Sequence, residues 1–83
     1  MIMHQNKATT NGMTDMQRKT LLRFEKGLTQ ALPNSRIVWA LPVEDDFIEL
    51  HLEHDKRTYR KSLKAAKLAI EAGEETGVLI ILR

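Results

Sequence analysis

Near Arg36 the spacing of the apolar residues changes, and this change limits the folds open to the chain. Before residue 36, apolar residues recur every three or four positions, which is the period of an amphipathic helix. After it, residues 36–41 are apolar on both alternating faces and residues 47–54 alternate strictly, as strands do. Helical spacing returns after Asp55, and residues 78–82 form a last apolar run. The expected order is helix, strand, strand, helix, strand.

The first helix has a recognisable start and end. Thr14 and Gln17 fit a capping box, in which each side chain bonds to the backbone N–H group of the other residue. Pro33 and Asn34 end the helix, because proline lacks an N–H donor and crowds the preceding turn. The apolar stripe expected to face the core consists of Met16, Leu21, Phe24, Leu28, Ala31 and Leu32. The opposite face carries Lys19, Arg23 and Lys26.

The order of the elements predicts the fold. Turn residues 42–46 join the first two strands, and a crossover helix joins the last two, which should therefore be parallel. Asp55 is the expected N-cap of that helix and Gly73 its end. We expect an α+β two-layer sandwich with a three-stranded sheet in the order 2-1-3, a split β-α-β unit similar to a truncated ferredoxin-like fold. Residues 1–13 are expected to form a flexible leader, and residues 14–83 a single domain.

The same patterns predict which side chains are buried. In the second strand, Ile48, Leu50 and Leu52 should point to the core, and Phe47 should lie on the opposite, partly open face. The expected apolar face of the second helix consists of Tyr59, Leu63, Ala66, Ala69 and Ile70. The aromatic residues assigned to the core are Phe24, Trp39 and Tyr59.

The last strand suggests self-association. Residues 78–82 are apolar on both faces, so an edge position would expose unpaired backbone groups and an apolar surface. We expect a homodimer formed through this C-terminal strand or through the open face of the sheet. The alternative is that residues 1–8 fold back over the same edge.

Composition excludes several classes of protein. The chain has no cysteine, which excludes disulfide scaffolds, thiol catalysis and cysteine-ligated metal sites. Its 13 Lys and Arg against 11 Asp and Glu give a net charge of only +2, which excludes a protein that is basic throughout. No run reaches the length of a membrane span, and the first twelve residues lack the apolar stretch of a signal peptide. We expect a cytoplasmic protein with no membrane association.

The charges are strongly segregated along the chain. Six acids without a base occupy residues 44–55: Glu44, Asp45, Asp46, Glu49, Glu53 and Asp55. Six bases without an acid then follow on one helical arc: Lys56, Arg57, Arg60, Lys61, Lys64 and Lys67. A positive helix start with free N–H groups suits phosphate, so these six residues are the candidate site for the backbone of DNA or RNA. Leu68, on the same arc, would add an apolar contact.

Two other interpretations of the basic arc remain open. The arc could be solvated or neutralised by the acidic hairpin, within one molecule or across a dimer. It could also dock an acidic protein. The expected function is a non-enzymatic accessory or regulatory nucleic-acid-binding module; the alternative is a homo-oligomeric adaptor with no nucleic-acid role.

A catalytic interpretation has one candidate. Glu49, His51 and Glu53 alternate along one strand face and could hold a divalent metal or exchange protons. No nucleophilic side chain lies in a recognisable catalytic sequence motif. The four glycines are dispersed along the sequence and do not form a phosphate-binding loop. We therefore expect no enzymatic activity, no cofactor and no metal.

Overall fold

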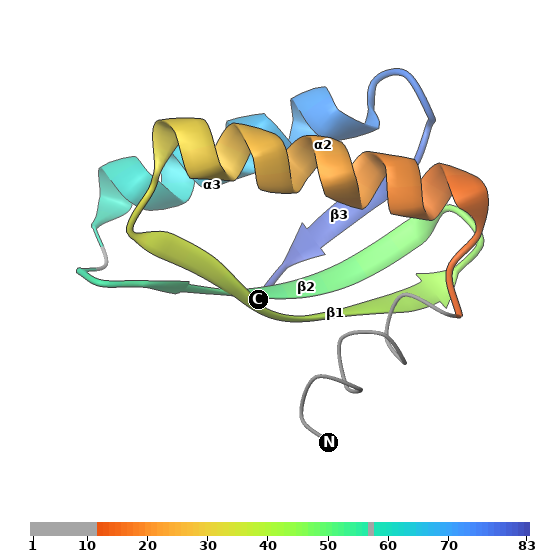
Figure 1. The fold of residues 1–83 in the computed structure, drawn as a ribbon, viewed down its shortest axis with the longest axis horizontal. Helices are drawn as coiled ribbons and strands as arrows, with labels where there is room; N and C mark the ends of the chain where they lie inside the picture. Colours follow the sequence, from red (N-terminus) through yellow and green to blue (C-terminus); the bar gives the residue numbers. More distant parts are fainter. Residues whose placement is uncertain (1–11, 57) are drawn as a thin grey trace.

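The computed structural model describes residues 12–56 and 58–83. The elements follow the expected order: α2 (Asp15–Ala31), β1 (Ser35–Glu44), β2 (Phe47–His54), α3 (Tyr59–Gly73) and β3 (Leu79–Leu82). Both helices lie on one face of the three-stranded sheet, and its other face carries no helix in the described part of the chain (Figure 1). The α+β two-layer prediction is confirmed. Residues 1–11 of the expected leader lie outside the described residues, whereas Met13 packs into the core.

The expected strand order 2-1-3 is wrong, because β2, not β1, is the central strand. The sheet has the order β1-β2-β3, with β1 antiparallel to β2 and β2 parallel to β3. A hairpin and a crossover are compatible with either order, so the connections alone do not choose between them. Ile48, Leu50 and Leu52 of β2 are all buried, as predicted, but this burial is expected in either order; the pairing of β2 with both β1 and β3 distinguishes the two. The unit is therefore not a split β-α-β arrangement.

β1 is longer and more exposed than the sequence suggests. It continues through Pro42 to Glu44, and its register against β2 shifts twice, between Ile37 and Trp39 and again between Pro42 and Glu44. Although residues 36–41 are apolar on both alternating faces, β1 is not buried on both faces. Its outward residues Val38, Leu41 and Val43 are exposed, because no described layer covers that side of the sheet.

The predicted core stripe of α2 is correct except at its start. Phe24 and Leu28 are buried, as expected, but Met16 is exposed. Gln17 and Thr20 take the inward positions of the first turns, at 1% and 0% exposure. Each of these polar side chains has hydrogen-bond partners that no apolar pattern could reveal.

α3 presents small residues to the core, not the large ones expected. Its buried residues are Ala65, Ala69 and Ala72, which allow the helix to approach the sheet and α2 closely. Of the predicted apolar face, Tyr59, Leu63, Ala66 and Ile70 are exposed and only Ala69 is buried. The N-cap is Thr58, whose side chain accepts from the N–H group of Lys61, and not Asp55. The predicted end at Gly73 is confirmed.

Gln17 joins the helical layer to the sheet. Its Oε1 accepts from the Thr14 N–H group at 2.8 Å, and its own N–H group donates to Thr14 Oγ1 at 3.1 Å, which confirms the capping box. Its Nε2 donates to the carbonyl oxygens of Glu44 and Phe47, which flank the turn between β1 and β2. One buried amide therefore caps α2 and satisfies two carbonyls of the hairpin.

We predict that Gln17→Glu destabilises the domain by roughly 2–4 kcal/mol at neutral pH. Glutamate can still cap Thr14, but its carboxylate faces two carbonyl oxygens and donates to neither. Burial there raises the pKa of the new carboxyl, so the deficit should shrink as the pH is lowered toward about 4, where the acid is protonated. Urea denaturation measures both effects. The exposed Gln30→Glu is the matched control, and equal stabilities of the two variants at neutral pH would contradict the role of Gln17.

Candidate functional site

α3 carries the candidate bases on its solvent-facing side. Arg60, Lys64 and Lys67 are exposed along the helix, and Lys56 is exposed in the loop before it. Lys61 is partly buried, and Arg57 lies outside the described residues. Four of the six candidate bases are therefore exposed, and Lys61 lies at the inner border of this side of the helix.

The acidic hairpin does not neutralise this face. Glu49 forms an ion pair with Arg83 at 2.6 Å, and Glu53 forms one with Arg36 at 2.6 Å. Both pairs lie on the open face of the sheet, opposite the helices. Among the ion pairs of the described residues, the one that joins this acidic segment to the basic helix is Asp55 with Lys61, at 2.7 Å. Within the described part of the chain, Arg60, Lys64 and Lys67 form no ion pair.

The acidic turn is also distant from the start of α3. Asp45 and Asp46 precede β2, whereas Lys56 and Arg60 follow it. The eight residues of β2 separate the two groups by about 25 Å, at about 3.3 Å per residue. Solvent ions screen charges at that separation, so the turn weakens the positive potential of the helix only slightly.

The second helix of the layer packs closely against α3. Gly27 of α2 lies so near to α3 that a Cβ atom there would come within 3.1 Å of Leu68 Cδ2. Lys26, the residue before it, is exposed but projects about 100° away from Gly27 around the helix. We use the name basic track for the exposed bases of α3 and the loop before it that form no ion pair among the described residues: Lys56, Arg60, Lys64 and Lys67.

The other end of the helical layer is mixed in charge. Arg23 of α2 forms an ion pair with Glu75 at 2.6 Å, and its hydrogen bond and charge lower the pKa of that carboxyl. Glu71 and Glu74 are exposed nearby at the end of α3. The basic track is therefore confined to the first two thirds of α3 and the loop before it.

Sequence reasoning misses Tyr59 as a neighbour of this surface. Tyr59 is expected in the core, yet it is 78% exposed as the first residue of α3, beside Arg60. Leu68 is expected to offer an outside contact and instead packs against the core.

The alternating Glu49, His51 and Glu53 do not form a site together. The two carboxylates bind arginines, and the His51 ring stacks on Trp39 with the ring centres 5.7 Å apart. Trp39 is thus a half-buried residue of the open sheet face and not a core residue. In the ranges 12–56 and 58–83, no group of three or more His, Asp or Glu side chains is placed to hold a metal ion.

No family model, no curated protein and no solved structure matches the chain. Neither α2 nor α3 has the length and apolar character that a bilayer-spanning helix requires.

The pair between Asp55 and Lys61 should be visible in a titration. The Lys61 side chain hydrogen-bonds to Asp55 and lowers the pKa of its carboxyl below the ordinary 3.8. A carboxyl with a lowered pKa in the folded state stabilises the fold above its unfolded pKa, and this contribution is lost as the pH falls through the folded pKa. We predict that Lys61→Gln returns the Asp55 pKa toward 3.8, measured by NMR. The neighbouring Lys64→Gln is the control and should leave it unchanged; an equal change in both variants would contradict the pair.

Proposed function

We propose that the chain is a non-enzymatic accessory protein that binds the phosphate backbone of nucleic acids through the basic track. The observation that supports this most is the exposure of Arg60, Lys64 and Lys67 on one side of α3, with no acid of the described hairpin paired to them. Charges that only stabilised the fold would be paired, or would sit where they favour the helix dipole. Arg60 lies in the first turn of α3, where the dipole opposes a cation, and Lys64 and Lys67 lie too far from the last turn for the dipole to favour them.

The spacing of the three bases suits a linear polyanion. Residues 60, 64 and 67 stand one helical turn apart and span about 10 Å of the helix, at about 1.5 Å per residue. That length covers roughly three nucleotides of a strand. Lysine contacts to phosphate position a nucleic acid without reading its bases, so binding should depend weakly on sequence. The exposed ring of Tyr59 offers one base a stacking surface at the start of the track.

A homo-oligomeric adaptor is the second candidate function. It is favoured by one observation: β3 lies at the edge of the sheet with Leu79 and Ile81 exposed. Self-association would use the β3 edge, whereas nucleic-acid binding would use the bases of α3. Absence of nucleic-acid binding at low salt, with self-association retained, would leave the adaptor as the remaining function.

We predict salt-dependent binding of the full chain to random-sequence duplex and single-stranded oligonucleotides. For a duplex, removing one phosphate-binding charge reduces the slope of log affinity against log salt by about 0.9. Lys64→Gln with Lys67→Gln should therefore weaken binding and reduce the slope by about 1.8. Fluorescence anisotropy over a salt series measures both quantities.

The matched control removes two positive charges from the opposite side of the molecule. Arg36→Gln with Arg83→Gln changes the net charge equally, but on the open sheet face. It should leave the affinity nearly unchanged. Wild-type protein that binds neither oligonucleotide at low salt, or equally weakened binding by the two double variants, would overturn the proposed function.

A further inference from the structure

β3 presents an unpaired backbone edge. Its ladder to β2 uses alternate residues, since the Leu79 N–H group donates to Asp46 and the Arg83 N–H group donates to Leu50, both at 2.8 Å. In a parallel pair the residues between them direct their N–H and C=O groups to the other side of the strand. Ile80 and Leu82 therefore face outward in the plane of the sheet, where the described residues supply no fourth strand.

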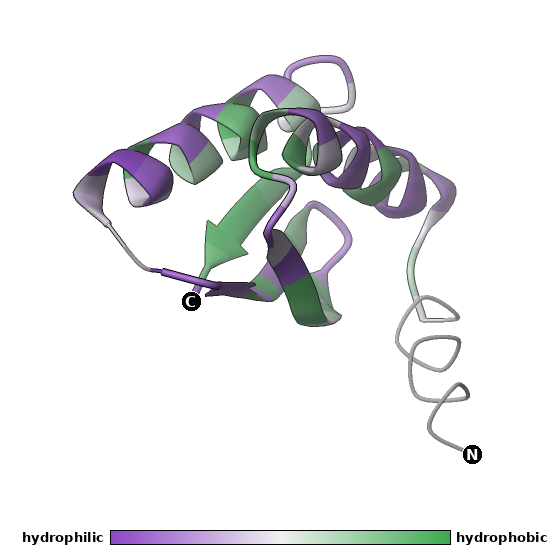
Figure 2. Cartoon of the chain, turned by 60° about the vertical axis from the view of Figure 1, so that its left-hand side comes forward, coloured by the Kyte–Doolittle hydropathy of each residue, from purple (hydrophilic) through white to green (hydrophobic). Residues whose placement is uncertain are grey.

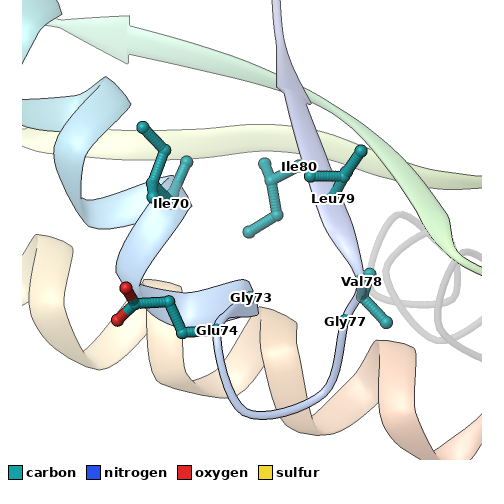
Figure 3. A pocket seen from close by; sticks show the side chains of 8 residues that line it. Ile70, Gly73, Glu74, Gly77, Val78, Leu79 and Ile80 are labelled. Carbon is teal, nitrogen blue, oxygen red and sulfur yellow. The ribbon is translucent and has the colours of Figure 1, made fainter.

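Apolar surface lies on both sides of this edge. On the open face of the sheet, Leu79 is 58% exposed and Ile81 is exposed beside it, and β3 is hydrophobic along its whole length (Figure 2). On the helical side, a groove of about 240 Å³ separates β3 from α3. Figure 3 shows Ile70 of α3 and Ile80 of β3 on its two walls and Glu74 at its rim.

The exposed flank of α3 continues the apolar surface. Leu63 and Ile70 are large, exposed and seven residues apart, so both lie on the same side of the helix. Ile70 lines the groove beside β3, which places this flank on the β3 side of the molecule, away from α2. A free strand edge between two apolar surfaces, with no charged residue in β3 itself, is costly to leave in water.

We infer that this edge binds a second copy of the chain, with β3 pairing antiparallel to the partner's β3 to form one six-stranded sheet. A symmetric register exists with Ile81 on the two-fold axis. Ile80 then faces the partner's Leu82, and each such pair exchanges two backbone hydrogen bonds. The outward-pointing N–H and C=O groups of Ile80 and Leu82 in the two copies then form four hydrogen bonds. The side chain of Ile81 contacts the partner's Ile81 on the open face of the sheet.

The same axis pairs the two copies of α3. Ile70 and Gly73 of α3 line the groove together with Leu79 of β3. Ala66 of α3 lines a second pocket together with Leu82 of β3. Ile81 is therefore level with the middle of α3. A two-fold axis there makes the two helices antiparallel, with Leu63 facing the partner's Ile70.

Charge complementarity selects a second copy as the occupant of this edge. Arg60 lies before Leu63 and Glu74 lies after Ile70, so each end of the helix pair brings an arginine to the partner's Glu74. This arrangement explains a charge layout that opposes the dipole of an isolated α3. In an antiparallel pair, the basic start of one helix adjoins the acidic end of the other. The inference does not rest on nucleic-acid binding.

The first test is the mass of the full chain in solution. Sedimentation equilibrium without nucleic acid should give a dimer mass that falls toward the monomer on dilution. A monomer mass at every concentration up to the highest tested would overturn the inference.

A single-cysteine crosslink tests the register, since the natural chain has no cysteine. Opposed residues of a non-hydrogen-bonded antiparallel pair are about 4.5 Å apart at Cα, within the range that a disulfide spans. Ile81→Cys should form a covalent dimer on oxidation with copper phenanthroline. Leu22→Cys, exposed on α2 far from the axis, is the control and should not crosslink more than at random collision rates. Equal crosslinking of both would overturn the register.

A charge exchange tests the helix contact. Arg60→Glu and Glu74→Arg should each weaken the dimer about tenfold, because each places like charges at both ends of the helix pair. The double variant should restore the dimer, since it exchanges the partners. Glu25→Arg, on the exposed side of α2, is the control for the change in net charge. Additive weakening in the double variant would overturn the antiparallel α3 contact.

Discussion

The buried amide of Gln17 is the interaction on which the two layers depend. It caps α2 through Thr14 and donates to the carbonyls of Glu44 and Phe47, so the start of the helix and the hairpin turn cannot move independently. One turn later, Thr20 bonds to Thr76, in the loop that leads into β3. Two buried polar residues of α2 thus fix the helix to one end of the sheet, where β1 ends and β2 and β3 begin. A network of this kind specifies one arrangement because its members have no alternative partners in an apolar core.

Features set by neighbouring residues could be predicted, and features set by distant ones could not. The capping box of Thr14, the inward face of β2 and the end of α3 at Gly73 follow from local patterns, and all three are present. The position of β2 at the centre of the sheet depends on which strand the whole core covers. The inward turn of Gln17 depends on a hairpin some 27 residues away. Neither the central position of β2 nor the burial of Gln17 produces a periodic pattern of apolar residues in the sequence.

The inner face of α3 shows why a helical projection can mislead. A helical projection assigns the large apolar residues to the buried face of α3. Close packing against the sheet and α2 instead requires the small residues Ala65, Ala69 and Ala72 on that face. Leu63 and Ile70 remain outside. The charge blocks behaved differently: the exposure of the basic track could be predicted from the sequence, but the partners of the acids could not, since Arg36 and Arg83 come from other parts of the sheet.

The irregularity of β1 determines how far edge pairing can extend the sheet. Its two register shifts and Pro42 distort the outer edge of β1 and leave it a poor template for another strand. The two edges of the sheet are therefore not equivalent. Pairing between two β3 edges uses the regular one and is closed by its own symmetry. In the proposed dimer, assembly would therefore end at two chains, whereas a second regular edge would allow fibres to grow.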